Sequence, residues 1–176
     1  MKKTSLVLML SAMFAAPAFA DDLYLGAKMG QANYGYANVS NNSQLGVGFL
    51  GGMAINQNIA LEAEYNTLGG FDSATGNIKG SALSMSGLGF LPLNRQVSLF
   101  GKLGVAVTTL NDTAKPGFVG NFSYTSTGVT YGLGAQFYMS RELSIRAGYD
   151  SYSVGTAASG TNTAGELYLA ALLHFN

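Results

Sequence analysis

After residue 20 the chain follows a pattern of period two, in which large apolar residues alternate with small or polar ones. In the segment LYLGAKMG (23–30) the odd positions are apolar, and the even positions carry Lys28 together with glycines and a tyrosine. This alternation is typical of a strand with two different faces. Eight such segments follow one another: 23–32, 44–55, 59–68, 80–91, 97–110, 127–139, 143–152 and 165–175.

The connections between these segments alternate in length. Short turns follow the second, fourth and sixth segments, at 56–58, 92–96 and 140–142. Long polar stretches follow the first, third, fifth and seventh, at 33–43, 69–79, 111–126 and 153–164. Short turns at one end and long loops at the other predict an all-β fold, an eight-stranded antiparallel up-and-down barrel.

The charged residues of the predicted strands all fall on the face opposite to the large apolar side chains. They are Lys28, Glu62, Glu64, Lys102, Arg146, Asp150 and Glu166. Alternation alone leaves two alternatives open, because this face could point to water around a soluble barrel or into the lumen of a membrane barrel.

Three features favour the lumen. Glycines cluster on the charged face, where they relieve crowding inside a narrow barrel. The alternation continues to the end of the sequence, so that the barrel can close without an edge. Aromatic residues lie near strand ends on the apolar face, as expected of girdles at the membrane interfaces: Tyr65, Phe90, Tyr131, Phe137, Tyr149 and Phe175. We therefore predict a transmembrane β-barrel whose lumen holds an ion-pair network.

The fourth segment fits this scheme poorly. If Ala82, Ser84, Ser86, Leu88 and Phe90 face the lipid, then Leu83, Met85 and Leu91 point into the lumen. A β-bulge near Gly87 would exchange the two faces midway along the strand and remove the conflict.

Composition adds a targeting segment and excludes several functions. Residues 1–20 combine two lysines, an apolar run and the sequence Ala18-Phe19-Ala20, which predicts a cleaved signal peptide and leaves 21–176 as the barrel domain. Removing Lys2 and Lys3 leaves seven Lys and Arg against nine Asp and Glu, which argues against a nucleic-acid partner. The chain has no cysteine, so a disulfide, a thiol nucleophile and a thiolate metal site are excluded.

The sequence resembles the eight-stranded outer-membrane barrels of Gram-negative bacteria, most closely the transmembrane domain of OmpA, with OmpX- and Ail-type proteins as more distant relatives. The stretches that carry the resemblance are LYLGAKMG, QLGVGFLGGMAIN, LEAEY, FGKLG and SRELSIRAGY. It implies a monomer in the cell outer membrane, in contact with lipid and lipopolysaccharide and assembled by the barrel-assembly machinery through its C-terminal strand.

The resemblance also implies roles for lumen residues. Glu62 corresponds to an acid whose exchange of ion-pair partners is proposed to gate a narrow water path in the family. Lys28, Lys102 and Arg146 correspond to the basic lumen residues. Two positions depart from the family: Gly87 stands where a lysine is expected in the fourth strand, and Gln136 where an acid is expected in the sixth.

We interpret the chain as a structural or weakly pore-forming, porin-like barrel. Its lumen charges form either an ion path or a salt-bridged plug, and the plug is favoured because a barrel of eight strands is normally filled. The alternative is a surface adhesion or ligand-binding protein that acts through aromatic residues of its outer loops. Those candidates are Tyr34, Tyr36, Phe118, Phe122 and Tyr124, with Phe71 beside them.

Catalysis and cofactors are not expected. Small barrels that cleave or transfer acyl chains need a histidine with a serine. The sole histidine, His174, has no serine next to it in the sequence, and we expect a structural role in the lumen. A metal site is not expected either, because the chain has no cluster of histidines.

Overall fold

The computed structural model describes residues 22–34, 43–72, 76–114, 122–155 and 161–175, which form eight strands. Within these ranges no helix is long and apolar enough to cross a membrane. The strands are β1 (Asp22–Tyr34), β2 (Ser43–Asn56), β3 (Ile59–Asp72), β4 (Gly76–Pro92), β5 (Val97–Ala114), β6 (Phe122–Tyr138), β7 (Leu143–Gly155) and β8 (Thr161–Phe175).

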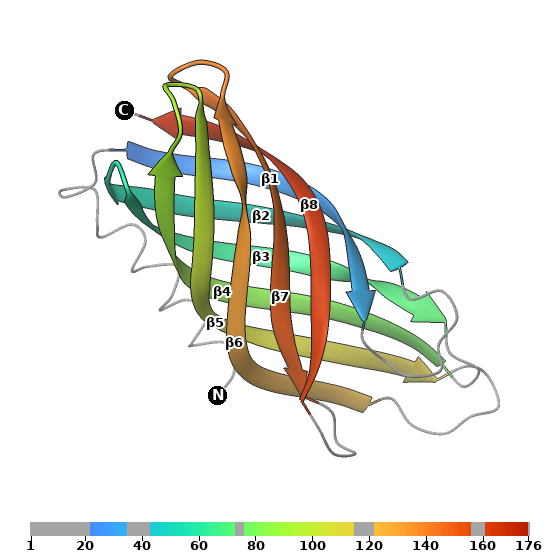
Figure 1. Cartoon of the computed structure of the whole chain (residues 1–176). Coiled ribbons are helices and arrows are strands. Elements are labelled where there is room, and N and C mark those ends of the chain that lie inside the picture. The colour runs from blue at the N-terminus through green and yellow to red at the C-terminus, as the bar shows by residue number, and fades with distance from the viewer. Residues whose placement is uncertain (1–21, 35–42, 73–75, 115–121, 156–160, 176) are drawn as a thin grey trace.

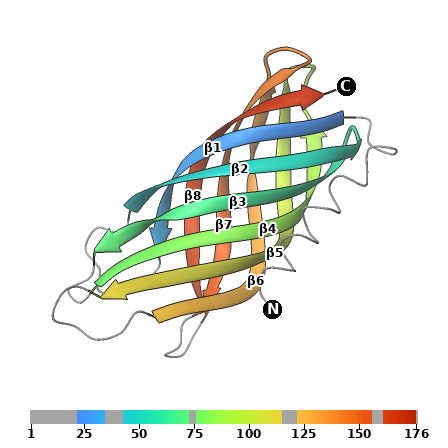
Figure 2. The ribbon, with the colours of Figure 1, turned by 180° about the vertical axis from the view of Figure 1, so that it is seen from behind.

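Each strand pairs antiparallel with its neighbours in sequence, and β1 also pairs with β8 (Figures 1 and 2). The last ladder runs from Leu23 opposite Phe175 to Tyr34 opposite Ala164, so the sheet closes on itself. The short turns gather at the upper left of Figure 1, which we call the turn end, and the opposite strand ends lie at the lower right, which we call the loop end. The predicted closed antiparallel barrel is confirmed.

The predicted strand limits hold at the turn end but are too short at the loop end. At the turn end all eight limits agree within one residue, whereas at the loop end every strand continues further by one to five residues. For example, β5 extends to Ala114 and β6 begins at Phe122. The ladder continues there because backbone pairing does not need apolar side chains once a strand has left the membrane.

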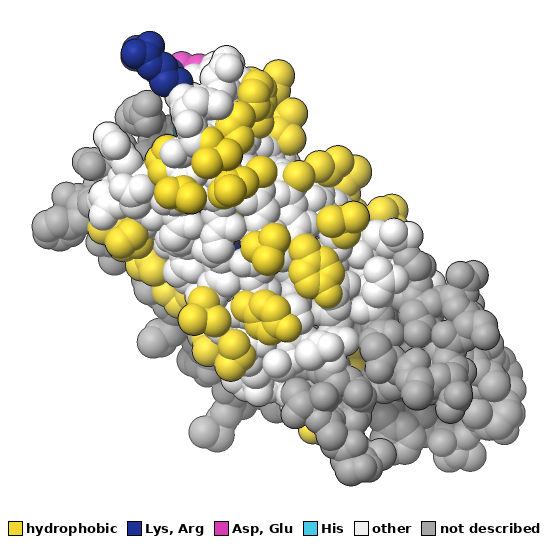
Figure 3. Space-filling view, viewed as in Figure 1, with side chains coloured by type: hydrophobic (Ala, Val, Ile, Leu, Met, Phe, Trp, Pro, Cys, Tyr) yellow, Lys and Arg dark blue, Asp and Glu magenta, His cyan; other side chains and the backbone are white. Residues whose placement is uncertain are grey.

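Burial alternates along the strands. In β7, Ser144, Arg146 and Asp150 are buried, whereas Ile145 and Tyr149 between them are exposed. Figure 3 shows apolar side chains spread over the strands, with the large charged ones gathered at the turn end. The apolar face of the barrel therefore points outward, and five of the six predicted girdle aromatics are 44% to 52% exposed on it: Tyr65, Tyr131, Phe137, Tyr149 and Phe175.

The sixth girdle residue and the predicted bulge are both wrong. In β4 the alternation is continuous, and its pairing with β5 runs without a shift from Gly76 to Pro92. Ser84 and Ser86 are buried and stand opposite Glu64 and Glu62 in the β3–β4 ladder. The polar side chains of β4 therefore point into the lumen. The residues facing the lipid are Leu83, Met85, Gly87 and Leu91, and Phe90 lies on the inner face, where its ring packs 6.0 Å from that of Phe100.

Glycines on the inner face permit close approach of neighbouring chain segments. A Cβ atom on Gly104 would overlap the Met85 carbonyl oxygen and the Ser86 side chain of β4. A Cβ atom on Gly101, which lies on the outer face of the same strand, would meet nothing within 4 Å. The narrow lumen thus requires glycine at position 104, whereas position 101 on the outer face of the same strand has room for a side chain.

We expect Gly104→Val to lower the free energy of unfolding by about 3 kcal/mol, because one of the overlapping atoms belongs to the backbone and cannot rotate away. The control Gly101→Val should change it by less than about 0.5 kcal/mol. Urea unfolding of the two variants in lipid vesicles measures the difference. Equal unfolding midpoints would show that the lumen is not close-packed at β5.

Candidate functional site

The lumen contains charged residues between two apolar clusters. The cluster nearer the turn end includes Tyr24, Leu50, Leu88, Phe100, Tyr168 and Leu172, and the cluster nearer the loop end consists of Ala32, Leu68, Ala82, Ala106, Tyr152 and Ala164, with Leu110 packed against it. All seven predicted lumen charges lie between them, and each is at most 3% exposed. We call these seven side chains the ion-pair layer.

Two lysines form the centre of the ion-pair layer. Lys28 Nζ of β1 lies 2.5 Å from Glu64 Oε1, 3.1 Å from Asp150 Oδ2 and 3.0 Å from Glu166 Oε2. Lys102 Nζ of β5 lies 2.9 Å from Glu64 Oε2 and 2.7 Å from Asp150 Oδ2. These contacts link β1, β3, β5, β7 and β8 across the inside of the barrel.

A second group surrounds Arg146 of β7. Its Nη1 lies 2.5 Å from Glu62 Oε2, and the Tyr24 hydroxyl donates to the same oxygen at 2.9 Å. Its Nε and Nη2 donate to Gln136 Oε1 at 3.0 and 2.9 Å. Gln136, the position at which the family resemblance predicts an acid, therefore still holds the arginine, through a neutral amide oxygen. The guanidinium carbon also lies 5.0 Å from the ring centre of Phe100.

The ion-pair layer contains four carboxylates and three cations. Neutral groups supply some of the hydrogen-bond donors that the extra carboxylate needs. The Tyr152 hydroxyl donates to Glu64 Oε1 at 2.7 Å, and the Asn66 amide donates to Glu166 Oε2. Three carboxylate oxygens have no hydrogen-bond partner within the described part of the chain: Glu62 Oε1, Asp150 Oδ1 and Glu166 Oε1. The layer is therefore well connected but has an excess of acceptors.

Oxygen atoms of Glu64, Asp150 and Glu166 lie within 4.8 Å of one another, a spacing compatible with a metal ion. The Lys28 ammonium, however, is within 3.1 Å of all three carboxylates and already supplies a positive charge to them. The arrangement is therefore an ion-pair cluster in which Lys28 occupies the place between the three carboxylates.

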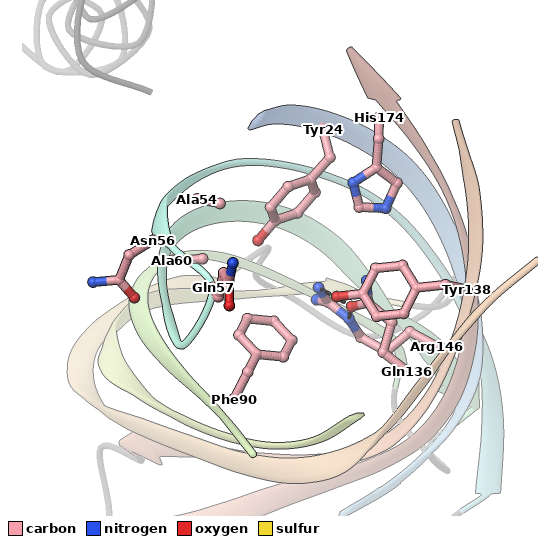
Figure 4. Close-up of a pocket in the computed structure, with 10 residues that line it drawn as sticks. All are labelled: Tyr24, Ala54, Asn56, Gln57, Ala60, Phe90, Gln136, Tyr138, Arg146 and His174. Atoms are coloured by element: carbon pink, nitrogen blue, oxygen red, sulfur yellow. Dashed lines mark hydrogen bonds between the residues drawn. The ribbon is translucent and has the colours of Figure 1, made fainter. Parts of the chain in front are cut away.

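A pocket of about 270 Å³ opens at the turn end and reaches the ion-pair layer (Figure 4). We call it the turn-end pocket. Rings of Tyr24, Phe90 and Tyr138 point into it, and Arg146 is the member of the ion-pair layer that lines it. The other lining residues are Ala54, Asn56, Gln57, Ala60, Gln136 and His174.

His174 has no serine next to it in the sequence, but the fold places Ser144 beside it. Ser144 Oγ lies 2.8 Å from His174 Nε2, and Gln136 Nε2 donates to Ser144 Oγ at 3.1 Å. The sequence separation of 30 residues hid this contact, and the register of β7 against β8, which pairs Leu143 with Leu173, would have shown it. Ser144 is fully buried and does not line the turn-end pocket, so the pair does not provide an accessible nucleophile.

The predicted loop aromatics are only partly described. Tyr36 and Phe118 lie outside the described residues. Tyr34 and Phe122 belong to strands β1 and β6 and not to loops, although their side chains are outside the described set. Tyr124 is also a β6 residue, and it is 40% exposed. Phe71 is likewise in β3, so the four loop assignments that lie within strands were wrong because the ladders extend further than expected.

Residues 6–175 match the family of the outer membrane protein beta-barrel domain. The chain belongs to this family. This assignment confirms the predicted resemblance and places the protein in the outer membrane. No curated protein matches the sequence closely enough to count as a relative.

Solved structures of outer-membrane barrels are similar to this member of the family. Neisserial surface protein A has a TM-score of 0.74 and 14% sequence identity, over 87% of this chain and 97% of its own. Ail, the attachment invasion locus protein of Yersinia pestis, has a TM-score of 0.65 and 18% identity, over 88% and 98%. The N-terminal β-barrel domain of Pseudomonas aeruginosa OprF has a TM-score of 0.65 and 12% identity, over 89% and 98%. At these identities the likeness shows the fold.

The charge balance of the ion-pair layer predicts unequal effects of two substitutions. Lys102→Met leaves Glu64 and Asp150 with one cation fewer, and we expect it to lower the free energy of unfolding by about 3–5 kcal/mol. Glu166→Gln removes a carboxylate from the layer that already has too many, and it should cost only about 1 kcal/mol. Urea unfolding in vesicles measures both, with Arg141→Met in an exposed turn as the control. An equal cost for both variants would contradict an acceptor-rich layer.

Proposed function

We propose that this outer-membrane barrel has a structural role, with a lumen that is closed at rest and conducts ions weakly when the ion-pair layer rearranges. The protein acts as a monomer surrounded by outer-membrane lipid and lipopolysaccharide, and the barrel-assembly machinery recognises β8. The observation that carries the proposal is the Arg146–Glu62 pair, which stands between the turn-end pocket and the two lysines of the ion-pair layer.

Burial supports a closed resting state. The side chains of Lys28, Lys102 and Asp150 have no exposed surface, and Arg146 has only 1%. A buried charge without a partner is energetically costly, so the charged side chains of the ion-pair layer stay paired with one another. The paired side chains leave no room for a hydrated ion.

The position of Lys102 supports a rearrangement. Its Nζ lies 3.9 Å from Glu62 Oε1, an oxygen without a hydrogen bond in the described structure, so Glu62 has a second cation within reach. Exchange of Glu62 from Arg146 to Lys102 would release Arg146 Nη1 at the base of the turn-end pocket, while Gln136 still holds Nε and Nη2. Position 87, where the family resemblance predicts a lysine, is a glycine that faces the lipid, and Ser86 is the residue opposite Glu62. The exchange proposed here uses Lys102 and therefore does not need a lysine at position 87.

Planar-bilayer recording of the refolded mature chain tests this function. We expect small, infrequent current steps for the unchanged protein, and a change of at least about tenfold in the open fraction for Glu62→Gln, since breaking a buried pair costs well above 1.4 kcal/mol. Glu142→Gln, in an exposed turn, is the control and should behave like the unchanged protein.

Folding must be verified in the same samples. A closed barrel runs at different apparent sizes on denaturing gels before and after boiling. If folded protein and folded Glu62→Gln are both silent, the ion-pair layer is a permanent plug and the pore-forming part of the proposal fails.

A second candidate is recognition of a surface ligand at the loop end. The exposed ring of Tyr124 and the extension of β5 and β6 beyond the predicted strand limits support it, because they form a paired stem for the segment between them. Ail, which is similar in fold at 18% identity, has been crystallised in complex with the heparin analogue sucrose octasulfate. Sucrose octasulfate is a ligand of Ail, and for the present protein it suggests heparin as a probe.

Binding of cells that display the protein to immobilised heparin tests the second candidate. Replacing residues 115–121 by a short Gly-Ser turn should reduce binding to the level of cells without the protein, whereas the same replacement of 156–160 should leave most of it. The deletion is confined to 115–121 because residues 111–114 and 122–126 belong to strands. Absence of heparin binding by the unchanged protein would remove this support for a polyanion-binding surface.

A further inference from the structure

The outer surface of β3, β4 and β5 changes from apolar to polar in register near the loop end. Tyr65, Leu83 and Val107 lie side by side at one level of the three strands. Thr67, Ser81 and Thr109 form the next outward-facing level, and Lys79 pairs with Asn111 at the level after that. Since the apolar band of a membrane barrel matches the hydrocarbon core, the last two levels lie at the depth of the lipid headgroups.

A β-bulge opens the surface at this depth. The pairing of β3 with β4 skips between Thr67 and Gly70, and Gly69 has a φ of 75°, a left-handed conformation that glycine adopts without strain. A hollow of about 250 Å³ results, which we call the β3–β5 hollow. Its lining residues are Tyr65, Thr67, Gly69, Lys79, Gly80, Ser81 and Asn111.

Lys79 is distinct from the other cations of the described chain. Lys28, Lys102 and Arg146 point into the lumen, and Arg95 and Arg141 lie in short turns, whereas Lys79 alone stands on the outward face of a strand. It is exposed, and no described carboxylate lies within ion-pair distance of it.

The neighbours of Lys79 supply neutral hydrogen-bonding groups. The side chains of Ser81 and Asn111 make no hydrogen bond within the described structure, so their hydroxyl and amide are available to a ligand. The Thr67 hydroxyl is already used, because it donates to the Val47 carbonyl at 2.8 Å. The ring of Tyr65 borders the hollow on the side of the hydrocarbon core and is half exposed.

We propose that the β3–β5 hollow binds a phosphate group of a phosphorylated glycolipid in the outer leaflet. Lys79 pairs with the phosphate, Ser81 and Asn111 donate hydrogen bonds to its oxygens, and the Tyr65 ring packs on the lipid below it. The hollow opens sideways to the membrane and continues the apolar surface at Tyr65, which favours an anion anchored in the bilayer over a soluble one. This inference rests on the proposed contact of the barrel with lipopolysaccharide, and it does not depend on conduction through the lumen.

Lipid retention by the refolded mature chain tests the proposal. The protein is placed in phosphatidylcholine nanodiscs that contain either bisphosphorylated lipid A or its dephosphorylated form, and native mass spectrometry counts lipids retained after release into detergent. We expect retention of the bisphosphorylated lipid to fall about fivefold in Lys79→Gln, as for loss of one lysine at an anionic surface. Arg95→Gln, which removes an exposed cation at the turn end, should retain it like the unchanged protein.

A second variant separates a shaped site from a bare surface charge. Ser81→Leu keeps Lys79 and fills the hollow, so retention should fall as in Lys79→Gln. Inorganic phosphate at millimolar concentration should not displace the lipid. Equal retention of the two lipid forms, a Lys79→Gln variant that binds normally, or a Ser81→Leu variant that binds normally would each overturn the site, and displacement by free phosphate would show that the site takes a soluble anion.

Discussion

The structure depends on the requirement that no backbone N–H or C=O group remains unpaired within lipid. Pairing of β1 with β8 meets this requirement by removing both edges of the sheet. Closure with eight strands makes a lumen just wide enough for side chains, so the inner face must be packed and cannot be left as open water. Charged side chains are excluded from the lipid face and enter the same narrow space, where each needs a partner.

The ion-pair layer is a costly way to fill the lumen. Apolar side chains of similar volume would fill the same space without the desolvation of seven charges, and replacement of buried ion pairs by apolar residues is often neutral or stabilising. The inner glycines show how closely the layer is fitted, because a Cβ atom on Gly132 would meet the Asp150 carboxylate and one on Gly30 would meet Glu166. Stability alone therefore does not explain these charges, and the 3.9 Å distance from Lys102 to Glu62 is the basis of the rearrangement proposed above.

The sequence predicts most of the barrel because inside and outside impose opposite chemistry on alternate residues. Closure, the turn end and the inward placement of the seven charges of the ion-pair layer follow from that alternation. Prediction from the alternation fails where both faces of a strand carry similar residues. In β4, small and apolar side chains occur on both faces, so Phe90 was predicted to face outward although its ring packs on that of Phe100. Contacts such as Ser144 with His174 depend on the register between strands, which a single sequence does not specify.

The two ends of the lumen are closed in different ways, and this asymmetry constrains any conducting state. The turn-end pocket reaches Arg146, and on this side the Arg146–Glu62 pair, packed against the rings of Tyr24 and Phe100, lies between the pocket and the two lysines of the ion-pair layer. On the loop side Leu68 and Tyr152 are fully buried in an apolar cluster. The proposed exchange of ion pairs would therefore open one barrier, and passage through the barrel would also require the loop-end cluster to part. Two barriers of unlike chemistry in series favour a barrel that is closed for most of the time.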